Sequence, residues 1–140
     1  MDKRSVLQVF EYTGEGYSPL VFSHDWQTAI LNWEPAADAT SLHEIERHVR
    51  SDEVFVLCRG KGAFVIMEED GLRIVEAIPG TVYNVHMGTW HTVIGDRGSS
   101  WIIVENRDTH IHDTEMIPLT ENELQLLRSQ LPEWADGRIK

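Results

Sequence analysis

The chain has 140 residues and a formal net charge of −11 at pH 7, with 41% hydrophobic and 25% charged residues. This length predicts a single domain over residues 1–140 that is large enough to bury a hydrophobic core. The negative charge argues against nucleic acid and against an anionic membrane surface as partners, because both would repel the protein. No stretch has the roughly 18 apolar residues of a membrane span or the pattern of a signal peptide, so we expect a cytoplasmic protein.

Short apolar segments separated by Gly, Pro, Asp and Asn follow one another along the chain, a pattern typical of an all-β domain. Turn sequences that contain glycine lie between several of them, for example at Pro79-Gly80. The pattern predicts strands at residues 7–12, 20–23, 28–33, 42–48, 54–58, 63–67, 73–77, 81–85, 89–94 and 101–105.

The first of these strands, 7–12, is a candidate for the edge of a sheet. Exposed edges carry unpaired backbone groups and pair readily between chains. We therefore expect a homodimer in which this strand is exchanged between the subunits.

Cys58 is the only cysteine, which excludes an intramolecular disulfide. It lies in the apolar segment 54–58. We therefore expect a small buried side chain rather than a catalytic thiol.

Residues 120–131 have the pattern of a terminal α-helix. The segment begins at Thr120 with the Thr-x-x-Glu form of a capping box and ends before Pro132. Apolar residues recur within it at helical spacing, and we expect them to face the barrel: Leu124, Leu127 and Leu131.

Four polar side chains of metal-binding type lie in or beside the predicted strands: Glu46, His48, Glu53 and His91. Successive side chains of a strand point to opposite faces, so a spacing of two puts Glu46 and His48 on the same face. Glu53 opens the next apolar segment and His91 lies in a later one, so a closed sheet could bring all four together. The sequence therefore predicts a divalent metal in a pocket inside a β-barrel. Two Glu and two His suit iron, manganese, zinc, nickel or cobalt and do not single out one of them.

Two segments resemble the conserved motifs of the cupin superfamily. Glu46 to Gly60 is similar to the first motif, G-x5-H-x-H-x3-4-E-x6-G, and Gly80 to His91 is similar to the second, G-x5-P-x-G-x2-H-x3-N. The two motifs occur in order, at the right separation and among predicted strands. The resemblance implies a small double-stranded β-helix, the jelly-roll barrel of the cupins, and we expect the C-terminal helix to lie against it.

The resemblance further implies that His48, Glu53 and His91 are metal ligands, and we extend this role to Glu46. Glu46 stands in place of the first motif's first His, so an anionic oxygen donor replaces a neutral nitrogen donor. Other departures from the motifs are Thr40 for the leading Gly, His86 for the Pro and Gly95 for the closing Asn.

Two alternatives stay open at the site. Glu46 could be a solvent-facing carboxylate paired with Arg47 or Arg50, since most Glu residues lie outside. In a cupin that has lost its metal, Glu53 would be a buried carboxylate hydrogen-bonded to the two histidines, with a perturbed pKa.

Further histidines lie close to the motifs. His86 comes five residues before His91, so an unbroken strand puts the two on opposite faces, although a bulge at Gly88 could change this. We expect His86 to line the pocket or to be structural. His110 and His112 have a His-x-His form, but they follow the last predicted strand and we expect a solvated loop.

Similarity to cupins implies a metal-dependent enzyme that acts on a small polar metabolite, as an isomerase, lyase, decarboxylase or dioxygenase. The metal would polarise a carbonyl or carboxylate of the substrate, or would bind oxygen. Glu46 would complete the ligand set or act as a general base. The alternative is a non-catalytic barrel that binds or senses a small ligand. An exchangeable position in the metal's coordination shell would favour the enzyme.

Overall fold

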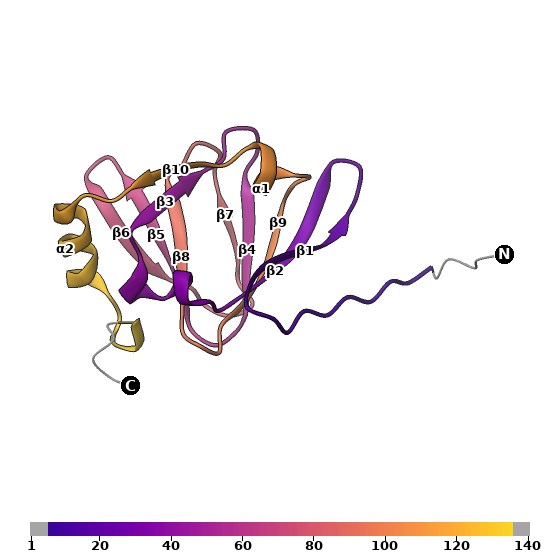
Figure 1. The fold of residues 1–140 in the computed structure, drawn as a ribbon, viewed down its shortest axis with the longest axis horizontal. Helices are drawn as coiled ribbons and strands as arrows, with labels where there is room; N and C mark the ends of the chain where they lie inside the picture. The colour runs from indigo at the N-terminus through magenta and orange to yellow at the C-terminus, as the bar shows by residue number, and fades with distance from the viewer. Residues whose placement is uncertain (1–5, 136–140) are drawn as a thin grey trace.

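The computed structural model describes residues 6–135, and two five-stranded antiparallel sheets form its body (Figure 1). The first sheet has the strand order β1 (Gly16–Phe22), β2 (Trp26–Asn32), β9 (Ser100–Asn106), β4 (Glu53–Arg59) and β7 (Val82–Val85). The second sheet has the order β10 (Glu115–Pro118), β3 (Glu44–Arg47), β8 (His91–Gly95), β5 (Gly62–Glu68) and β6 (Gly71–Glu76). The helices are η1 (Pro35–Ala37), η2 (Ala39–Ser41), α1 (Thr109–His112), α2 (Glu121–Gln130) and η3 (Glu133–Ala135). The predicted all-β jelly roll with a C-terminal α-helix is confirmed.

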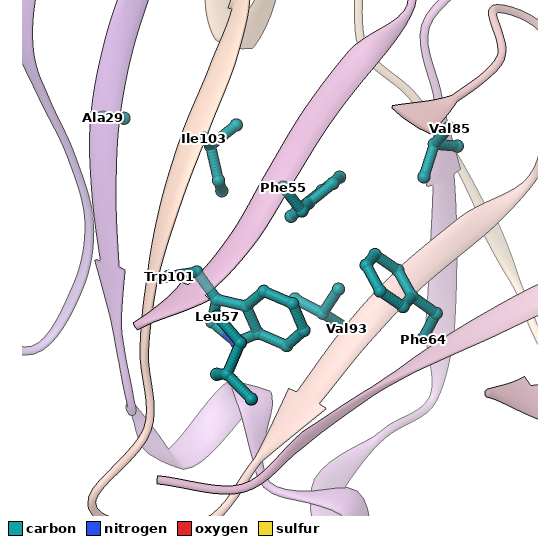
Figure 2. Close-up of a cluster of buried hydrophobic side chains, with 8 residues drawn as sticks. All are labelled: Ala29, Phe55, Leu57, Phe64, Val85, Val93, Trp101 and Ile103. Atoms are coloured by element: carbon teal, nitrogen blue, oxygen red, sulfur yellow. The ribbon is translucent and has the colours of Figure 1, made fainter. Parts of the chain in front are cut away.

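Strand alternation divides the first sheet into an inner and an outer face. In β4, Phe55 and Leu57 are buried, whereas Val54 and Val56 are half-buried on the opposite face. The inner faces of both sheets meet in one cluster, in which three aromatic rings pack edge to face with centroids 5.2–5.9 Å apart. Figure 2 shows this cluster, which consists of Ala29, Phe55, Leu57, Phe64, Val85, Val93, Trp101 and Ile103.

Helix α2 packs on the second sheet beside β6 (Figure 1). A capping box fixes its start: the Thr120 hydroxyl accepts from the Glu123 backbone N–H, and the Glu123 carboxylate accepts from the Thr120 backbone N–H. Leu127 is only 1% exposed and belongs to the cluster on this side of the sheet. The predicted helix over 120–131 is confirmed. The three leucines that were expected to face the barrel pack in or against that cluster: Leu124, Leu127 and Leu131.

The predicted strand 7–12 is wrong, because residues 8–13 have no regular secondary structure and β1 begins only at Gly16. Gly16 pairs with Asn32, the last residue of β2. The residues before Gly16 would have to pair with residues beyond Asn32, where β2 has already ended. Instead, the Asn32 amide donates to the carbonyls of Tyr12 and Gly14, at 3.0 and 2.8 Å. Figure 1 shows the segment running away from the barrel. Its exchange between subunits stays a prediction.

Two more features differ from the sequence-based expectations. Strand β10 was not predicted, and it exists because its four residues pair with β3. Cys58 is exposed rather than buried, since Leu57 takes the inward position in β4. Within residues 6–135, no helix is long and apolar enough to cross a membrane. The single domain over residues 1–140 stays a prediction, and residues 1–5 and 136–140 lie outside the described part.

Candidate metal centre

The four residues of the predicted metal set lie together at one end of the barrel interior. Glu46 lies in β3 and is paired in register with His91, the first residue of β8. His48 directly follows β3, and Glu53 is the first residue of β4. One potential ligand atom from each of the four lies within 4.8 Å of the others, so the group could hold a metal ion. His48, Glu53 and His91 are buried, whereas the Glu46 side chain is 33% exposed.

A single carboxylate oxygen joins the two imidazoles. Glu53 Oε1 lies 3.0 Å from His48 Nε2 and 2.9 Å from His91 Nε2. The other ring nitrogens face backbone carbonyls, with His48 Nδ1 2.7 Å from the Asp113 oxygen and His91 Nδ1 2.9 Å from the Thr89 oxygen. A carbonyl oxygen can only accept, so each Nδ1 carries the hydrogen and each neutral ring turns its Nε2 lone pair toward Glu53.

This donor set fits a divalent metal. Two Nε2 lone pairs and a carboxylate oxygen are all acceptors, and they repel one another unless a proton or a cation lies among them. Fixing a metal-binding histidine through an Nδ1–H···O=C hydrogen bond is the usual support for such a ligand. Two ligands held at about 2.1 Å and at right angles would be about 3.0 Å apart, which matches the spacing found here.

Protons take the place of the cation when no metal is bound. Burial lowers the pKa of His48, but the hydrogen bond and charge of Glu53 outweigh it and raise that pKa to about 9. Burial alone would raise the pKa of Glu53, but the hydrogen bonds from the two histidines lower it to about 2. The same carboxylate raises the pKa of His91 against the effect of burial. A metal ion must therefore compete with protons for the two imidazoles.

Glu46 faces this centre rather than a surface arginine. Its Oε1 lies 3.9 Å from His48 Nε2, and burial together with the charge of Glu53 raises the pKa of Glu46. Arg47 Nε donates instead to Glu115 at 2.7 Å, and its guanidinium stacks on Trp90. Arg47 therefore forms an ion pair with Glu115 and not with Glu46.

The centre opens into a cavity of about 310 Å³ between the two sheets. Apolar residues form much of its wall, among them Leu31, Phe55 and Ile103. A cavity of this volume suits a small metabolite.

The sequence analysis missed a second polar group at the cavity wall. Tyr17, Glu105 and His110 line the cavity, and the buried Gln27 contacts all three. The Tyr17 hydroxyl donates to Glu105, and Gln27 Nε2 lies 2.8 Å from Tyr17 Oη, 3.2 Å from Glu105 Oε1 and 2.9 Å from His110 Nδ1. Burial and the negative charge of Glu53 raise the pKa of Glu105 to about 8. Burial and the Glu105 carboxylate also raise the pKa of Tyr17.

The sequence did carry a signal for one member of this group. Glu105 follows Trp101 and Ile103 at a spacing of two in β9, so strand alternation points it inward with them. His110 could not be found in this way, because it lies in the short helix α1 and not in the expected loop. Its ring packs against Tyr17 with centroids 5.4 Å apart.

His86 lies outside the centre. Its side chain is 82% exposed, and its Nδ1 is 3.6 Å from Asp52. It lines a separate cavity beside Phe64 and Tyr83. The expectation that His86 lines the metal pocket is therefore wrong, because its side chain faces this second cavity and solvent.

No family model matches the chain, and no curated protein matches its sequence. Among solved structures, a cupin-2 domain protein from Shewanella frigidimarina is 19% identical, with 68% of this chain and 85% of that chain covered and a TM-score of 0.52. An oxalate decarboxylase from Bacillus subtilis is 15% identical, with 68% and 25% covered and a TM-score of 0.54. The iron(II) form of HppE is 13% identical, with 64% and 48% covered and a TM-score of 0.51. The chain thus spans a quarter of the decarboxylase and about half of HppE, and at these identities the likeness shows the fold alone.

Proposed function

We propose that this chain, which has the cupin fold, is a metal-dependent enzyme acting on a small polar metabolite. The observation that carries the proposal is the convergence of three buried donors, His48, Glu53 and His91, on one point that opens into a cavity. Buried carboxylates and imidazoles without a cation are costly, and structural stability does not require them. The reaction type is an isomerisation, a lyase reaction, a decarboxylation or a dioxygenation.

The proposed roles follow from the contacts of each side chain. His48 and His91 bind through Nε2, since the carbonyls of Asp113 and Thr89 hold their Nδ1–H groups. Glu53 binds through its carboxylate and cancels part of the metal's charge. Glu46, the most exposed of the four, completes the set or takes a proton from the substrate.

When bound, a divalent metal supplies a Lewis acid that polarises a substrate oxygen. The protein positions the substrate with the apolar wall of the cavity, which also limits the access of water. Tyr17 and Glu105 offer a hydroxyl and a carboxyl group in the same cavity for hydrogen bonds to substrate hydroxyl or carbonyl groups.

Metal content and turnover test this proposal. We expect elemental analysis of the purified protein to find about one first-row divalent metal per chain, and chelation to remove it. Metal-loaded and chelated protein are then incubated with an extract of small polar metabolites, and mass spectrometry compares the products. A change that needs the metal supports an enzyme. Full metal content with ligand binding but no product would support the small-ligand binding barrel instead, and absence of metal binding would contradict the proposed enzyme.

We also propose that the chain forms a homodimer through the outer face of the first sheet. Register alignment places two cross-strand rows on this face: Ile30, Ile102, Val56 and Val82 in one, and Thr28, Val104, Val54 and Asn84 in the other. A solvated sheet face normally carries polar residues, so this apolar face marks a contact. The extended segment before β1 adds exposed apolar side chains that a second copy could bury, Val6, Val9 and Phe10.

Light scattering on a size-exclusion column tests the dimer. We expect a mass of two chains for the wild type and of one chain for Ile102→Glu, because a buried unpaired carboxylate disrupts an apolar interface. Leu126→Glu is the matched control, since Leu126 is an exposed leucine on α2, away from this face. A monomeric wild type would contradict the proposal. The cytoplasmic location stays a prediction.

A further inference from the structure

We propose that the cavity selects a small ligand that carries a positive charge, such as a protonated amine, beside an uncharged oxygen donor for the metal. This inference rests on the proposed metal site and names the class of substrate for it. It follows from the charges of the cavity wall, which differ from those of a site for carboxylates or phosphates.

All the charged side chains that line the cavity are acidic or are histidines. Five glutamates line it: Glu53 and Glu105 are buried, and Glu34, Glu44 and Glu46 are half-buried. No lysine or arginine is among the residues that line it. A bound ligand therefore meets carboxylates on several sides.

These carboxylates are not neutralised by basic side chains outside the cavity. In the described part of the chain, the ion pairs of the five glutamates involve only histidines, with His43 Nε2 3.9 Å from Glu44 and the two buried histidines on Glu46 and Glu53. The nearest basic neighbour in β3, Arg47, is bound to Glu115. The negative potential of the wall is thus left for the ligand.

An anionic ligand finds no arginine or lysine in the wall of this cavity. Carboxylates and phosphates are held by arginine forks, by lysines or by the N-termini of helices. Here the metal would be the main positive charge, and Glu46 and Glu53 already offset the two positive charges of a divalent ion. The carboxylates of Glu34 and Glu44, which lie outside the metal set, then favour a cation and repel an anion.

The apolar wall agrees with a small organic cation rather than a second inorganic ion. Leu31, Phe55 and Ile103 line the same cavity and can pack against a carbon frame. A hydroxyl or carbonyl oxygen on that frame would reach the metal while the amine faces the acidic residues. The Tyr17 ring, half-buried in the wall, provides an aromatic surface for the cation.

Cobalt-substituted protein tests this inference, because its visible spectrum reports both metal binding and ligand approach to the metal. Cobalt content is measured first, so that failure of the metal site is seen separately. Three probes of the same size and different charge are then titrated at low ionic strength: 2-aminoethanol, ethylene glycol and glycolate. We expect 2-aminoethanol to bind at least about tenfold more tightly than glycolate, with ethylene glycol between them.

Removing two wall carboxylates that are outside the metal set sharpens the test. The double variant Glu34→Gln with Glu44→Gln should bind 2-aminoethanol severalfold more weakly and glycolate severalfold more tightly, because the wall loses negative charge. The matched control, Glu69→Gln with Glu133→Gln, removes the same charge from exposed positions outside the cavity and should change neither affinity. Added salt should reduce the difference in affinity between the three probes, because it screens the charges of the wall.

Two outcomes would overturn the inference while leaving the metal site in place. One is cobalt-loaded protein that binds glycolate more tightly than 2-aminoethanol. The other is a spectrum that 2-aminoethanol does not change at high concentration. Failure to bind cobalt at all would instead contradict the proposed function.

Discussion

The two ends of the barrel interior are built from the same strands but have opposite chemistry. At one end, the rings of Phe64 and Trp101 pack against each other between the sheets, and Phe55, which contacts both rings, also contacts His91 at the other end (Figure 2). At the other end, Glu53 and Glu105 lie among histidines and line a cavity. β4 contributes Glu53 to one end and Leu57 to the other, and β9 contributes Glu105 and Trp101. Strand alternation therefore decides only that a side chain points inward, and its position along the strand decides which end it joins.

This difference separates stability from function. The aromatic end buries apolar surface, which favours folding, whereas the polar end buries carboxylates at a cost that hydrogen bonds and protons offset only in part. The following predictions test whether the two ends can be damaged separately.

Trp101→Ala should have the largest effect on stability. Trp101 is 2% exposed and its ring contacts both phenylalanines, so its removal leaves a large cavity. We expect a loss of about 3–5 kcal/mol in the free energy of unfolding, measured by urea denaturation. Ile111→Ala is the control, because Ile111 is 63% exposed and its truncation should cost much less. Equal losses in the two variants would contradict the assignment of the core.

His91→Ala should remove most of the bound metal with a smaller effect on folding. His91 Nε2 points at Glu53 in the cavity, so the variant loses a ligand while the aromatic end stays intact. Elemental analysis measures the metal, and circular dichroism checks the fold. His86→Ala, at an exposed histidine outside the centre, should keep its metal. Full metal occupancy in His91→Ala would show that the ligand assignment is wrong.

Glu46→Gln should weaken metal binding by about tenfold if the carboxylate is a ligand, since the amide has lost the negative charge. Competition with a chromogenic chelator measures the affinity. Glu44→Gln is the matched control, because Glu44 lies two residues away in β3 and outside the set of four. An unchanged affinity in Glu46→Gln would return Glu46 to the role of a half-exposed carboxylate.

The smallest effect concerns pH in the metal-free protein. The pKa of Glu105 is raised from 4.5 to about 8 and that of His48 from 6.5 to about 9, so both groups bind protons more strongly in the folded state. Their contributions are complete below the unfolded values and are lost as pH rises through the folded values. We therefore expect the Tm of the chelated protein to fall between about pH 5 and pH 9. The opposite slope would contradict this account.

Glu105→Gln separates the two contributions. Glutamine is neutral at every pH, so the variant should lose the Glu105 contribution, which falls away between pH 4.5 and about pH 8. It should keep the His48 contribution, which falls away between pH 6.5 and about pH 9. Thermal melts of both proteins over the same pH series measure this difference. At low pH, the wild type should also lose the stability that the ionised Glu53 provides as pH falls from 4.5 toward 2.

Much of the fold and of the site could be predicted because its signals are local. The capping box at Thr120 and the leucine spacing in α2 depend on residues three or four apart. The apolar segments and their turns predicted most of the strands, and the spacing of Glu46, His48 and Glu53 placed these residues around one turn between neighbouring strands. His91 was added by its motif, and its in-register pairing with Glu46 bears this placement out.

The errors lie where a partner distant in sequence decides the outcome. The segment 7–12 has the composition of a strand, but β2 ends before reaching it. The converse holds for β10, whose four residues become a strand only because β3 lies alongside.

The sequence by itself determined the inward-facing pattern through its periodicity. Its resemblance to the cupin motifs indicated the jelly-roll class and the four polar side chains that converge at one end of the barrel. Only the tertiary structure decided that Tyr17, Gln27 and His110 gather around Glu105, since they come from separate strands and a helix. The same holds for the acidic cavity without lysine or arginine, which is a property of the assembled wall and of no single segment.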